Sequence, residues 1–541
     1  MRIFAGIYVA CLLFTCAAAA QPVVTPNGIV NAASSSPIPM PNSAIARGSM
    51  FSIYGQNMGP STSPALTWPL KDDLGGVVVN IQPSSGQAQR AILLYVSPGQ
   101  INAILPSTVS EGQATLKVTY NGATSAPQGF TVVKSSVGLL ARNMRGNGPG
   151  VVQNYHTGTP AFNSVAESAI PGGVAVLWGT GLGPVTFDEK QPPKQGDLSS
   201  GAEVWVAGQR ATVDYAGRST SAGQDQINFV VPTNIEACYV PVFVKVGNVV
   251  SNTITMSISK TGKVCSDAFT PDVDPAVLQR DGLRHGYVTL GRTTANIMGM
   301  SMKTDLASAS FYKYDWARLM QVQAPFGVSS MGACSVVTYR GQAPAGPVVP
   351  DYLEAGTPIT ITGPDNVARQ ITRTGKGSYS AQLGGGMPGM PDTLPDYFVA
   401  GKYTITGAGG ADVKAFTTSI TLPTPMTWTN EAQINDVTRS AGLKVTWSGA
   451  AGYVMILGYS GVSVPQDAGA QFQCIAPASA GSFTVPAAVL QALPASGIAN
   501  AVPIGALVVV NHTEPVKFTA DGLNAADLMG AFTTIKVVAY K

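Results

Sequence analysis

The side chains that could perform chemistry in this chain are few and far apart. Its three histidines are His156, His285 and His512, and none has a second ligand nearby at metal-site spacing. A serine hydrolase presents its nucleophile on a Gly-x-Ser-x-Gly turn, and the nearest match, Gly458-Tyr-Ser-Gly461, lacks the final glycine spacing. His285 would be the choice for a base, but an isolated histidine at a strand entry is usually structural. We therefore predict no catalytic residue, no metal site and no cofactor.

Pairs of aspartates leave one route to hydrolysis open. Asp272 with Asp274, and Asp392 with Asp396, lie in proline-rich loops. A glycosidase uses two carboxylates that the fold brings to either side of the scissile bond, wherever they stand in the sequence. The alternative function is therefore a secreted, glycosidase-like hydrolase with its site in residues 266–541 and the preceding repeats as spacers.

Aromatic side chains are the candidates for ligand binding. Tyr312, Tyr314 and Trp316 alternate along a strand-like segment whose other side is wet at Lys313, and three aromatics in line could stack on sugar rings. Burial of the same face in a core is the commoner arrangement. Trp205 lies between two valines, so alternation directs it toward solvent or a domain interface. We predict these four aromatic residues as ligand-binding positions.

The cysteines predict two disulfides. Cys238, Cys265, Cys334 and Cys474 follow the N-terminal segment, and an even number in an exported chain indicates disulfide bonds. Chain order favours Cys238 with Cys265 and Cys334 with Cys474 among the three pairings available. Metal-binding thiolates are disfavoured because the sequence has no Cys-x-x-Cys motif.

Residues 1–20 have the charged, apolar and small-residue regions of a secretory signal peptide. Cleavage is predicted between Ala20 and Gln21, which predicts a secreted protein, extracellular or associated with the cell surface, with the periplasm as the alternative. A lipoprotein processing site at Cys16 is the competing interpretation, although Thr15 before it fits poorly. No later run reaches the roughly 18 apolar residues of a membrane helix.

Composition excludes some classes of partner. Only 11% of the 541 residues are charged and the net charge is +3, which favours neither nucleic acid nor an anionic membrane surface. The 60 glycines and 39 prolines, with abundant valine and threonine, are typical of extracellular chains built from short strands and many turns. The length predicts several domains of roughly 100 to 150 residues each.

An internal repeat identifies the elements that must position these residues. Gly48–Pro60 returns as Gly172–Pro184 at an offset of 124 residues, and Gln100-Ile-Asn102 returns as Gln226-Ile-Asn228 at an offset of 126. Two copies of one domain therefore stand in tandem. The segment from Gly179 follows a strand and is rich in glycine, but a proline follows it where a nucleotide-binding motif would begin a helix. We therefore interpret this segment as a tight turn.

The repeated Gln-Ile-Asn motif has two interpretations. The structural one, which we favour because both copies carry the motif, buries Ile101 and Ile227 and uses the amides to bond loop backbone. The functional one makes the four amides a repeated polar ligand site: Gln100, Asn102, Gln226 and Asn228.

Three segments carry a family resemblance: Asn27-Gly-Ile-Val-Asn-Ala-Ala33, Tyr95-Val-Ser-Pro-Gly-Gln-Ile-Asn102 and Leu177-Trp-Gly-Thr-Gly-Leu-Gly-Pro184. They resemble an uncharacterised family of exported acidobacterial proteins, whose repeats are similar to the immunoglobulin-like IPT/TIG domains of surface receptors and secreted enzymes. The resemblance covers about residues 22–260 and implies β-sandwiches and a secreted location without implying a reaction. Repeat two departs at Asp225, which replaces a glycine of repeat one.

Strand-like runs continue after residue 260 without a third copy of the repeat, and one short helix is predicted at 486–493. The predicted fold is all-β, with tandem immunoglobulin-like β-sandwiches followed by further β-sandwich modules. The predicted divisions are a signal peptide (1–20), repeat one (21–136), a linker hairpin plus repeat two (137–260), a β-rich domain (261–424) and a C-terminal β-sandwich (425–541).

The function that these observations predict is non-catalytic binding or adhesion outside the cell or at its surface. The expected partner is a polysaccharide or a protein. The sequence leaves the oligomeric state open.

Overall fold

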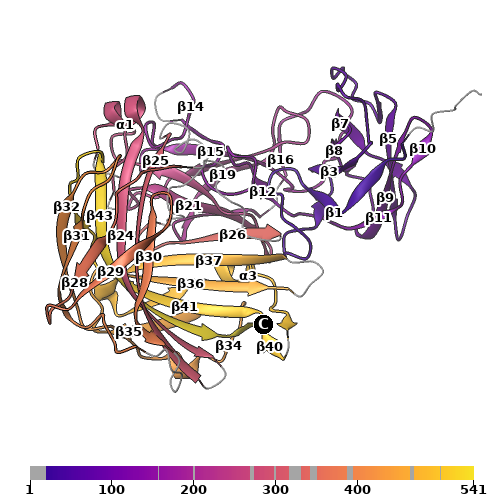
Figure 1. Ribbon diagram of the computed structural model, residues 1–541. Coiled ribbons are helices and arrows are strands. Elements are labelled where there is room, and N and C mark those ends of the chain that lie inside the picture. Colours follow the sequence, from indigo (N-terminus) through magenta and orange to yellow (C-terminus); the bar gives the residue numbers. More distant parts are fainter. Residues whose placement is uncertain are drawn as a thin grey trace, which may run out of the picture.

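The computed structural model describes residues 20–541 except 156–157, 199–200, 268–272, 298–299, 316–329, 341–349, 387–393, 463–467 and 500. Strands dominate the described chain (Figure 1). The two α-helices among these residues are α1 (Pro275–Asp281) and α3 (Ala487–Gln491), and two short 3-10 turns lie at Glu431–Gln433 and Ala478–Ala480. The helix predicted at 486–493 is confirmed as α3, with Pro486 at its N-cap. No described helix has the length and apolar character needed to cross a membrane.

Repeat one is a sandwich of two sheets. The first has the order β1-β3-β8-β7, with strands β1 (Val23–Asn31), β3 (Met50–Gln56), β8 (Gln100–Ile104) and β7 (Ile92–Val96). The second has the order β2-β11-β9-β5-β4, with strands β2 (Ile45–Ala46), β11 (Gln128–Val133), β9 (Gly112–Tyr120), β5 (Val77–Pro83) and β4 (Asp73–Leu74). Strands β6 (Gln89–Arg90) and β10 (Ala123–Thr124) pair beside this path. Alternate residues such as Ile53, Ile101 and Leu116 fill the core between the sheets.

Repeat two has the same arrangement. Its first sheet has the order β14-β13-β15-β20-β19-β16, with strands β14 (Ala161–Phe162), β13 (Val152–Asn154), β15 (Val174–Thr180), β20 (Asp225–Val230), β19 (Val213–Arg218) and β16 (Gly196–Asp197). Its second has the order β18-β17-β21-β22, with strands β18 (Gln209–Ala211), β17 (Glu203–Val206), β21 (Ala237–Val246) and β22 (Val249–Val250). Strand β12 (Gly138–Leu139) pairs with β15, and β23 (Ile254–Ile258) pairs with β21. The order β13-β15-β20-β19 matches β1-β3-β8-β7 in repeat one, so the sequence repeat is also a structural repeat.

The pairing explains two features of the sequence. The apolar runs of β3 and β15 belong to interior strands, each with a hydrogen-bonded neighbour on both edges. The hairpin predicted between the repeats is formed by β13 and β14, where Gln153 pairs with Phe162. This hairpin is not a separate linker, because β13 also pairs with β15 and so extends the first sheet of repeat two.

The second half is organised around one 14-stranded sheet of order β26-β37-β36-β41-β43-β24-β25-β30-β29-β28-β31-β32. Its strands are β24 (Leu283–Ile297), β25 (Met300–Tyr314), β26 (Cys334–Arg340), β28 (Ile359–Thr362), β29 (Ala368–Gly375), β30 (Ser378–Gly386), β31 (Gly401–Gly407), β32 (Phe416–Leu422), β36 (Tyr453–Gly461), β37 (Ala468–Pro477), β41 (Gly505–His512) and β43 (Ala525–Val537), with β27 (Asp351–Tyr352) and β42 (Val516–Lys517) at the side. Strands β24 and β43 are parallel neighbours although they lie about 240 positions apart, so residues on both sides of position 424 share one sheet.

Three small sheets complete the second half. They contain β33 (Thr427–Trp428), β35 (Leu443–Ser448) and β38 (Ser482–Val485); β34 (Asp436–Val437) and β44 (Ala539–Tyr540); and β39 (Ile498–Ala499) and β40 (Val502–Pro503). One core joins β24, β25 and β43 to β28, β31 and β32, which fold back over them. A second core joins β36, β37 and β41 to β35, β38 and α3. The fold is all-β, with tandem immunoglobulin-like sandwiches and further β-sandwich structure after them.

Repeat two packs against the second half, and most of repeat one lies farther from it (Figure 1). Phe243, on the outer face of β21, and Val250 of β22 belong to the same buried cluster as α3 and β26. Met40, from the segment after β1, also enters this cluster. Apolar burial therefore holds the tandem half to the second half.

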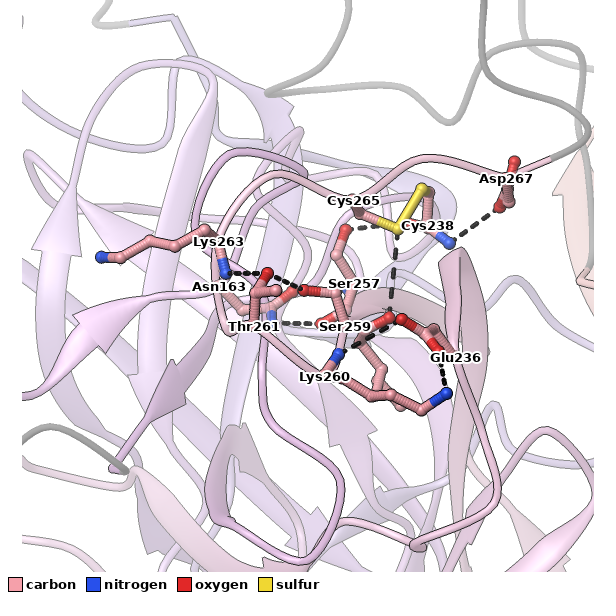
Figure 2. Close-up of a disulfide and its surroundings, with 11 residues drawn as sticks. Asn163, Glu236, Cys238, Ser257, Ser259, Lys260, Thr261, Lys263, Cys265 and Asp267 are labelled. Carbon is pink, nitrogen blue, oxygen red and sulfur yellow. Dashed lines mark hydrogen bonds and ion pairs between the residues drawn. A yellow bond between two sulfur atoms is a disulfide. The ribbon is translucent and has the colours of Figure 1, made fainter.

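The pairing favoured by chain order is the pairing in the structure, with bonds Cys238–Cys265 and Cys334–Cys474. Figure 2 shows the first, which ties β21 to the segment after β23. The backbone N–H of Cys238 donates to Asp267 Oδ2 at 2.8 Å. Cys238, Cys265 and Asp267 have ligand atoms close enough for a metal ion, but the two sulfurs are bonded to each other and so offer no thiolate.

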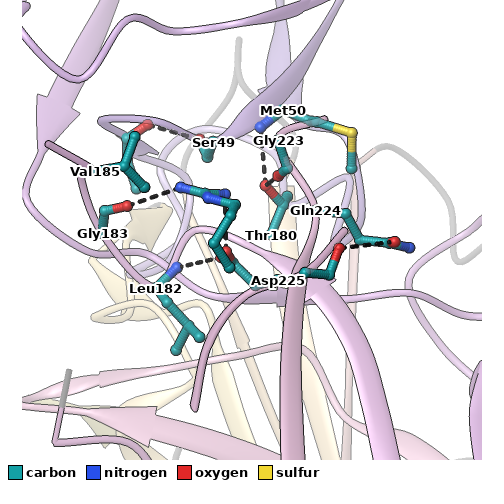
Figure 3. Close-up of polar contacts among 12 residues, drawn as sticks. Ser49, Met50, Thr180, Leu182, Gly183, Val185, Gly223, Gln224 and Asp225 are labelled. Atoms are coloured by element: carbon teal, nitrogen blue, oxygen red, sulfur yellow. Dashed lines mark hydrogen bonds and ion pairs between the residues drawn. The ribbon is translucent and has the colours of Figure 1, made fainter. Parts of the chain in front are cut away.

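A buried polar junction joins the two repeats (Figure 3). The Met50 backbone N–H of repeat one donates to Thr180 Oγ1 of repeat two at 2.8 Å, and the Ser107 hydroxyl donates to Glu189 Oε1 at 2.9 Å. Behind these bonds, the buried Arg218 guanidinium lies 2.8 Å from Asp225 Oδ1. The junction combines these directional bonds with a small apolar cluster of Leu70, Ile92 and Ile104, against which Ala222 of repeat two packs.

Candidate ligand-binding surface

The predicted aromatic row does not form an open platform in the described residues. Tyr312 is only 8% exposed, and its hydroxyl lies 3.0 Å from His285 Nδ1. Tyr314 is half-buried and packs edge-on against Tyr312, with ring centroids 4.9 Å apart. Trp316 lies outside the described residues. Tyr312 is therefore buried in a core, which is the commoner of the two arrangements considered for this face.

His285 belongs to a hydrogen-bonded chain across three strands. Its Nδ1 lies next to Tyr312, and its Nε2 lies 2.7 Å from Asp527 Oδ2 of β43. The order Asp–His–hydroxyl is that of a catalytic triad. However, the Tyr312 side chain is buried, so its hydroxyl is not open to a substrate. The chain fastens β24, β25 and β43 to one another.

Trp205 lies at a domain interface, one of the two positions that alternation predicts for it. It stacks on its cross-strand neighbour Phe243, with ring centroids 6.1 Å apart and planes 9° from parallel. Its indole N–H donates to Glu203 Oε2 at 3.2 Å. Trp205 packs against the buried cluster of the second half, so its ring stabilises this interface.

The remaining candidates for acid–base chemistry do not converge among the described residues. His512 is partly buried and stacks on Tyr453, and desolvation lowers its pKa to about 4. Asp396 Oδ2 lies 3.1 Å from Arg292 and 3.7 Å from Lys303, and Asp274 is exposed just before α1. The other three candidates lie outside the described residues: His156, Asp272 and Asp392.

The Gln-Ile-Asn motif marks a different surface. Ile101 and Ile227 are buried, as predicted. The amides on either side do not bond loop backbone as expected, because they pair with each other on the outer face of the sheet. In repeat two, Gln226 Nε2 donates to Asn228 Oδ1 at 2.8 Å. Gln100 and Asn102 make the same bond at the same distance in repeat one.

Aromatic and amide side chains surround the Gln226–Asn228 pair. Register places Trp178 opposite Gln226, and Tyr215 opposite Asn228. On the other side of β15, register places Gln153 opposite Val176 and Phe162 opposite Gln153. Cross-strand partners share a face, and the intervening residues Leu177 and Ile227 face the core. We call this outward set the amide–aromatic face of repeat two: Gln153, Phe162, Trp178, Tyr215, Gln226 and Asn228.

The side chains of this face are ordered by their own bonds. The Trp178 indole N–H donates to Gln153 Oε1 at 3.0 Å, and the Tyr215 hydroxyl donates to the Arg218 carbonyl at 2.6 Å. Phe162 is 51% exposed, with the Arg142 guanidinium 6.0 Å from its ring centroid. The aromatic rings are therefore positioned before any ligand arrives, which lowers the entropy cost of binding.

Repeat one carries a smaller version of the same face. Tyr54 lies opposite Gln100, and Tyr95 lies opposite Asn102. Both tyrosines are about two-fifths exposed, at 40% and 42%. The Ser52 hydroxyl also donates to Asn102 Oδ1, at 2.9 Å. We call this set the amide–aromatic face of repeat one: Tyr54, Tyr95, Gln100 and Asn102.

Each amide pair leaves the same two groups unused. In repeat two, Gln226 Oε1 can accept and Asn228 Nδ2 can donate, and neither has a partner among the described residues. Gln100 Oε1 and Asn102 Nδ2 are left in the same way in repeat one. Both repeats thus present one acceptor and one donor beside aromatic rings, which are exposed in repeat one and partly buried at Trp178 and Tyr215 in repeat two.

The aromatic members of these faces were missed in the sequence, although one signal was available. Tyr54 and Trp178 occupy the same position of the repeated strand, so an aromatic residue next to the repeated amides could have been read from the repeat. Phe162 has no such signal, because its place on the face depends on pairing through β13.

No protein-family model matches the chain, and no curated protein matches it in sequence. Similar solved structures include the Bacteroides ovatus mixed-linkage glucan utilization locus SGBP-B in complex with a mixed-linkage heptasaccharide, at 14% identity over 78% of each chain with a TM-score of 0.13. Sidekick-1 immunoglobulin domains 1–5 match at 10% identity over 92% of this chain and 96% of that chain, with a TM-score of 0.12. Chicken CNTN1 FN1–FN3 domains match at 10% identity over 74% and 98%, with a TM-score of 0.13. These values limit the likeness to fold class.

Proposed function

We propose that this chain is a secreted, non-catalytic binding protein that acts outside the cell or at its surface on a polysaccharide or protein partner. The observation that carries the proposal is the amide–aromatic face, which occurs at equivalent positions in both immunoglobulin-like repeats. Preorganised aromatic rings beside unused amide groups are suited to recognition. They include no acid, base or nucleophile for a reaction.

The two disulfides support the proposed location. Such bonds form and persist in oxidising compartments outside the cytosol. The signal peptide expected at residues 1–20 fits the same location. We include in the proposal kinship with the IPT/TIG-like repeats of exported acidobacterial proteins, which rests on the sequence resemblance over about residues 22–260.

The buried polar clusters support a non-catalytic role. The His285 chain links strands β24, β25 and β43, and His512 stacks on Tyr453 with ring centroids 5.0 Å apart. Both clusters are accounted for as structural contacts.

A paired screen tests the proposal. The purified protein is screened against immobilised polysaccharides and extracellular proteins, and in parallel incubated with polysaccharide, ester and peptide substrates. We expect binding to at least one partner and no product from any substrate. Turnover that a single aspartate or glutamate substitution abolishes would establish the hydrolase instead. Failure to bind either class of partner would also overturn the proposal.

A further inference from the structure

The amide–aromatic faces carry an inference about the class of ligand, which rests on the proposed function and goes beyond it. We propose that these faces bind one neutral polysaccharide chain, with pyranose rings against the aromatic side chains and vicinal hydroxyls on the amide pairs. The face of repeat two is the larger site, and the face of repeat one is a second site for the same polymer.

Hydrogen-bond complementarity points to hydroxyl groups. Gln226 Oε1 needs a donor and Asn228 Nδ2 needs an acceptor, and these atoms belong to amides joined at 2.8 Å. A sugar hydroxyl can donate and accept, so two neighbouring hydroxyls of one ring satisfy both amide atoms. Repeat one offers the same pair of groups through Gln100 and Asn102.

The charge of the face points to a neutral ligand. All six residues that define it in repeat two are uncharged, and the neighbouring cation, Arg142, already lies over the Phe162 ring. A polyanion would need several cations, as phosphate and carboxylate ligands are held by arginine and lysine. Aromatic rings instead bury the apolar faces of flat neutral sugars.

The shape of the face favours a chain over a folded protein. Its members span five adjacent strands, from Phe162 on β14 to Tyr215 on β19, or ~19 Å at the usual strand spacing. Along the strands, the row formed by Trp178 and Gln226 lies two residues, or ~7 Å, from the row that contains Asn228. A strip of this size covers on the order of 150 Å², whereas a stable protein interface needs about 800 Å² from each partner. A long, narrow strip fits an oligosaccharide.

Repetition is the second, independent observation. Between the copies the central position of the strand changes from Ser52 to Val176, yet the amide pair and an aromatic residue opposite its glutamine remain. A purely structural role would require the buried isoleucine between the amides. It would not require that Tyr54 and Trp178 stay aromatic at an outward position.

Affinity electrophoresis of the full chain tests the proposal. Gels contain hydroxyethylcellulose, arabinoxylan or galactomannan as neutral polymers, and alginate as the charged comparison. We expect the wild-type protein to be retarded by at least one neutral polymer and not by alginate. The variant W178A/N228A should weaken that binding more than tenfold, and Y54A/N102A should weaken it less.

Phe162→Ala keeps the test independent of folding, because Phe162 is 51% exposed and little packing is lost. It should weaken binding by between about two- and tenfold, the range expected for one aromatic contact. The matched control is Trp68→Ala, which removes a 48% exposed aromatic residue outside both faces and should leave retardation unchanged.

Three results would overturn the proposal. Wild-type retardation that persists in both F162A and W178A/N228A would place the sugar site elsewhere and leave the proposed function standing. Retardation by alginate alone would make the ligand acidic. Binding to an extracellular protein that these variants weaken, with no retardation by a neutral polymer, would make the face a protein interface.

Discussion

Asp225 is a buried carboxylate of repeat two that lies behind the junction between the repeats. It replaces Gly99 of repeat one and is almost fully buried. Its Oδ2 accepts from the Leu182 backbone N–H at 2.7 Å, and its Oδ1 lies 2.8 Å from Arg218. Arg218 in turn donates to the Gly183 carbonyl at 3.0 Å. The Asp225 side chain thus connects the glycine-rich turn at Leu182 to Arg218 at the end of β19.

Removing this carboxylate should destabilise the tandem half. Asp225→Ala leaves the Leu182 backbone N–H and the Arg218 guanidinium without the acceptor that Asp225 supplies in either protonation state, and each buried polar group left unpaired typically costs about 1–3 kcal/mol. Denaturant unfolding measures the loss. The control is Glu236→Gln, which breaks the exposed ion pair with Lys260 and should change the unfolding free energy far less, because solvent screens that pair. Equal effects of the two substitutions would show that the stability of the tandem half does not depend on Asp225.

The same carboxylate predicts a pH dependence. Burial, the largest influence, raises the pKa of Asp225 from 3.8 to about 6, against the opposing effect of Arg218. The folded state then binds this proton more tightly than the unfolded state, so the stability it contributes is present below pH 4 and lost as the pH rises through 6. Burial also raises the pKa of the neighbouring Glu189, which acts in the same direction.

The comparison is between wild type and the double variant D225N/R218Q, which retains Glu189 but neither charge of the ion pair. From pH 7 to pH 3.5 the unfolding free energy of wild type should rise relative to the variant by up to about 3 kcal/mol. Denaturant titrations at each pH measure the difference. A difference that falls as the pH is lowered would show that the Asp225 pKa is depressed in the folded protein.

Among the elements, β26 depends most on a covalent bond. It is the edge strand of the large sheet and pairs with β37 alone among the described strands, with Cys334 directly opposite Cys474. The disulfide closes a sequence separation of 140 residues. Long closed loops gain the most from a cross-link in the chain-entropy account.

Replacing both cysteines, C334A/C474A, should therefore lower the unfolding free energy by about 2–5 kcal/mol. It should also increase hydrogen exchange at residues 335–340. The comparison variant C238A/C265A removes the disulfide that closes a separation of only 27 residues. It should leave the backbone of β26 protected from hydrogen exchange. A free thiol at Cys334 in the oxidised wild-type protein would contradict the pairing itself.

Local patterns predicted the elements well because their causes are local. Alternation places Leu116 and Val118 in the core of repeat one, and Pro486 begins α3, as expected from strand and helix periodicity. The parallel pairing of β24 with β43 has no local signal, since the strands lie about 240 residues apart. The face that includes Phe162 was missed for the same reason, because it exists only after three separate strands have paired.

At the scale of the whole molecule, apolar contact sets the position of the repeats relative to the second half. Phe243 is buried in the interface cluster, so Phe243→Ala should cost about 3–5 kcal/mol. It should also loosen the tandem half from the second half, seen as a larger radius of gyration in solution scattering. Tyr155→Ala removes a 43% exposed aromatic residue and should change neither quantity. An unchanged radius in F243A would indicate that other contacts fix the arrangement.

The most direct test of the whole account measures binding and turnover in one sample. Wild-type protein is incubated with the neutral polysaccharide that retards it, and the bound fraction and the polymer chain length are followed together. The account predicts stable binding with the chain length unchanged. A polymer that shortens with time, with the shortening abolished by one aspartate or glutamate substitution in residues 266–541, would contradict it.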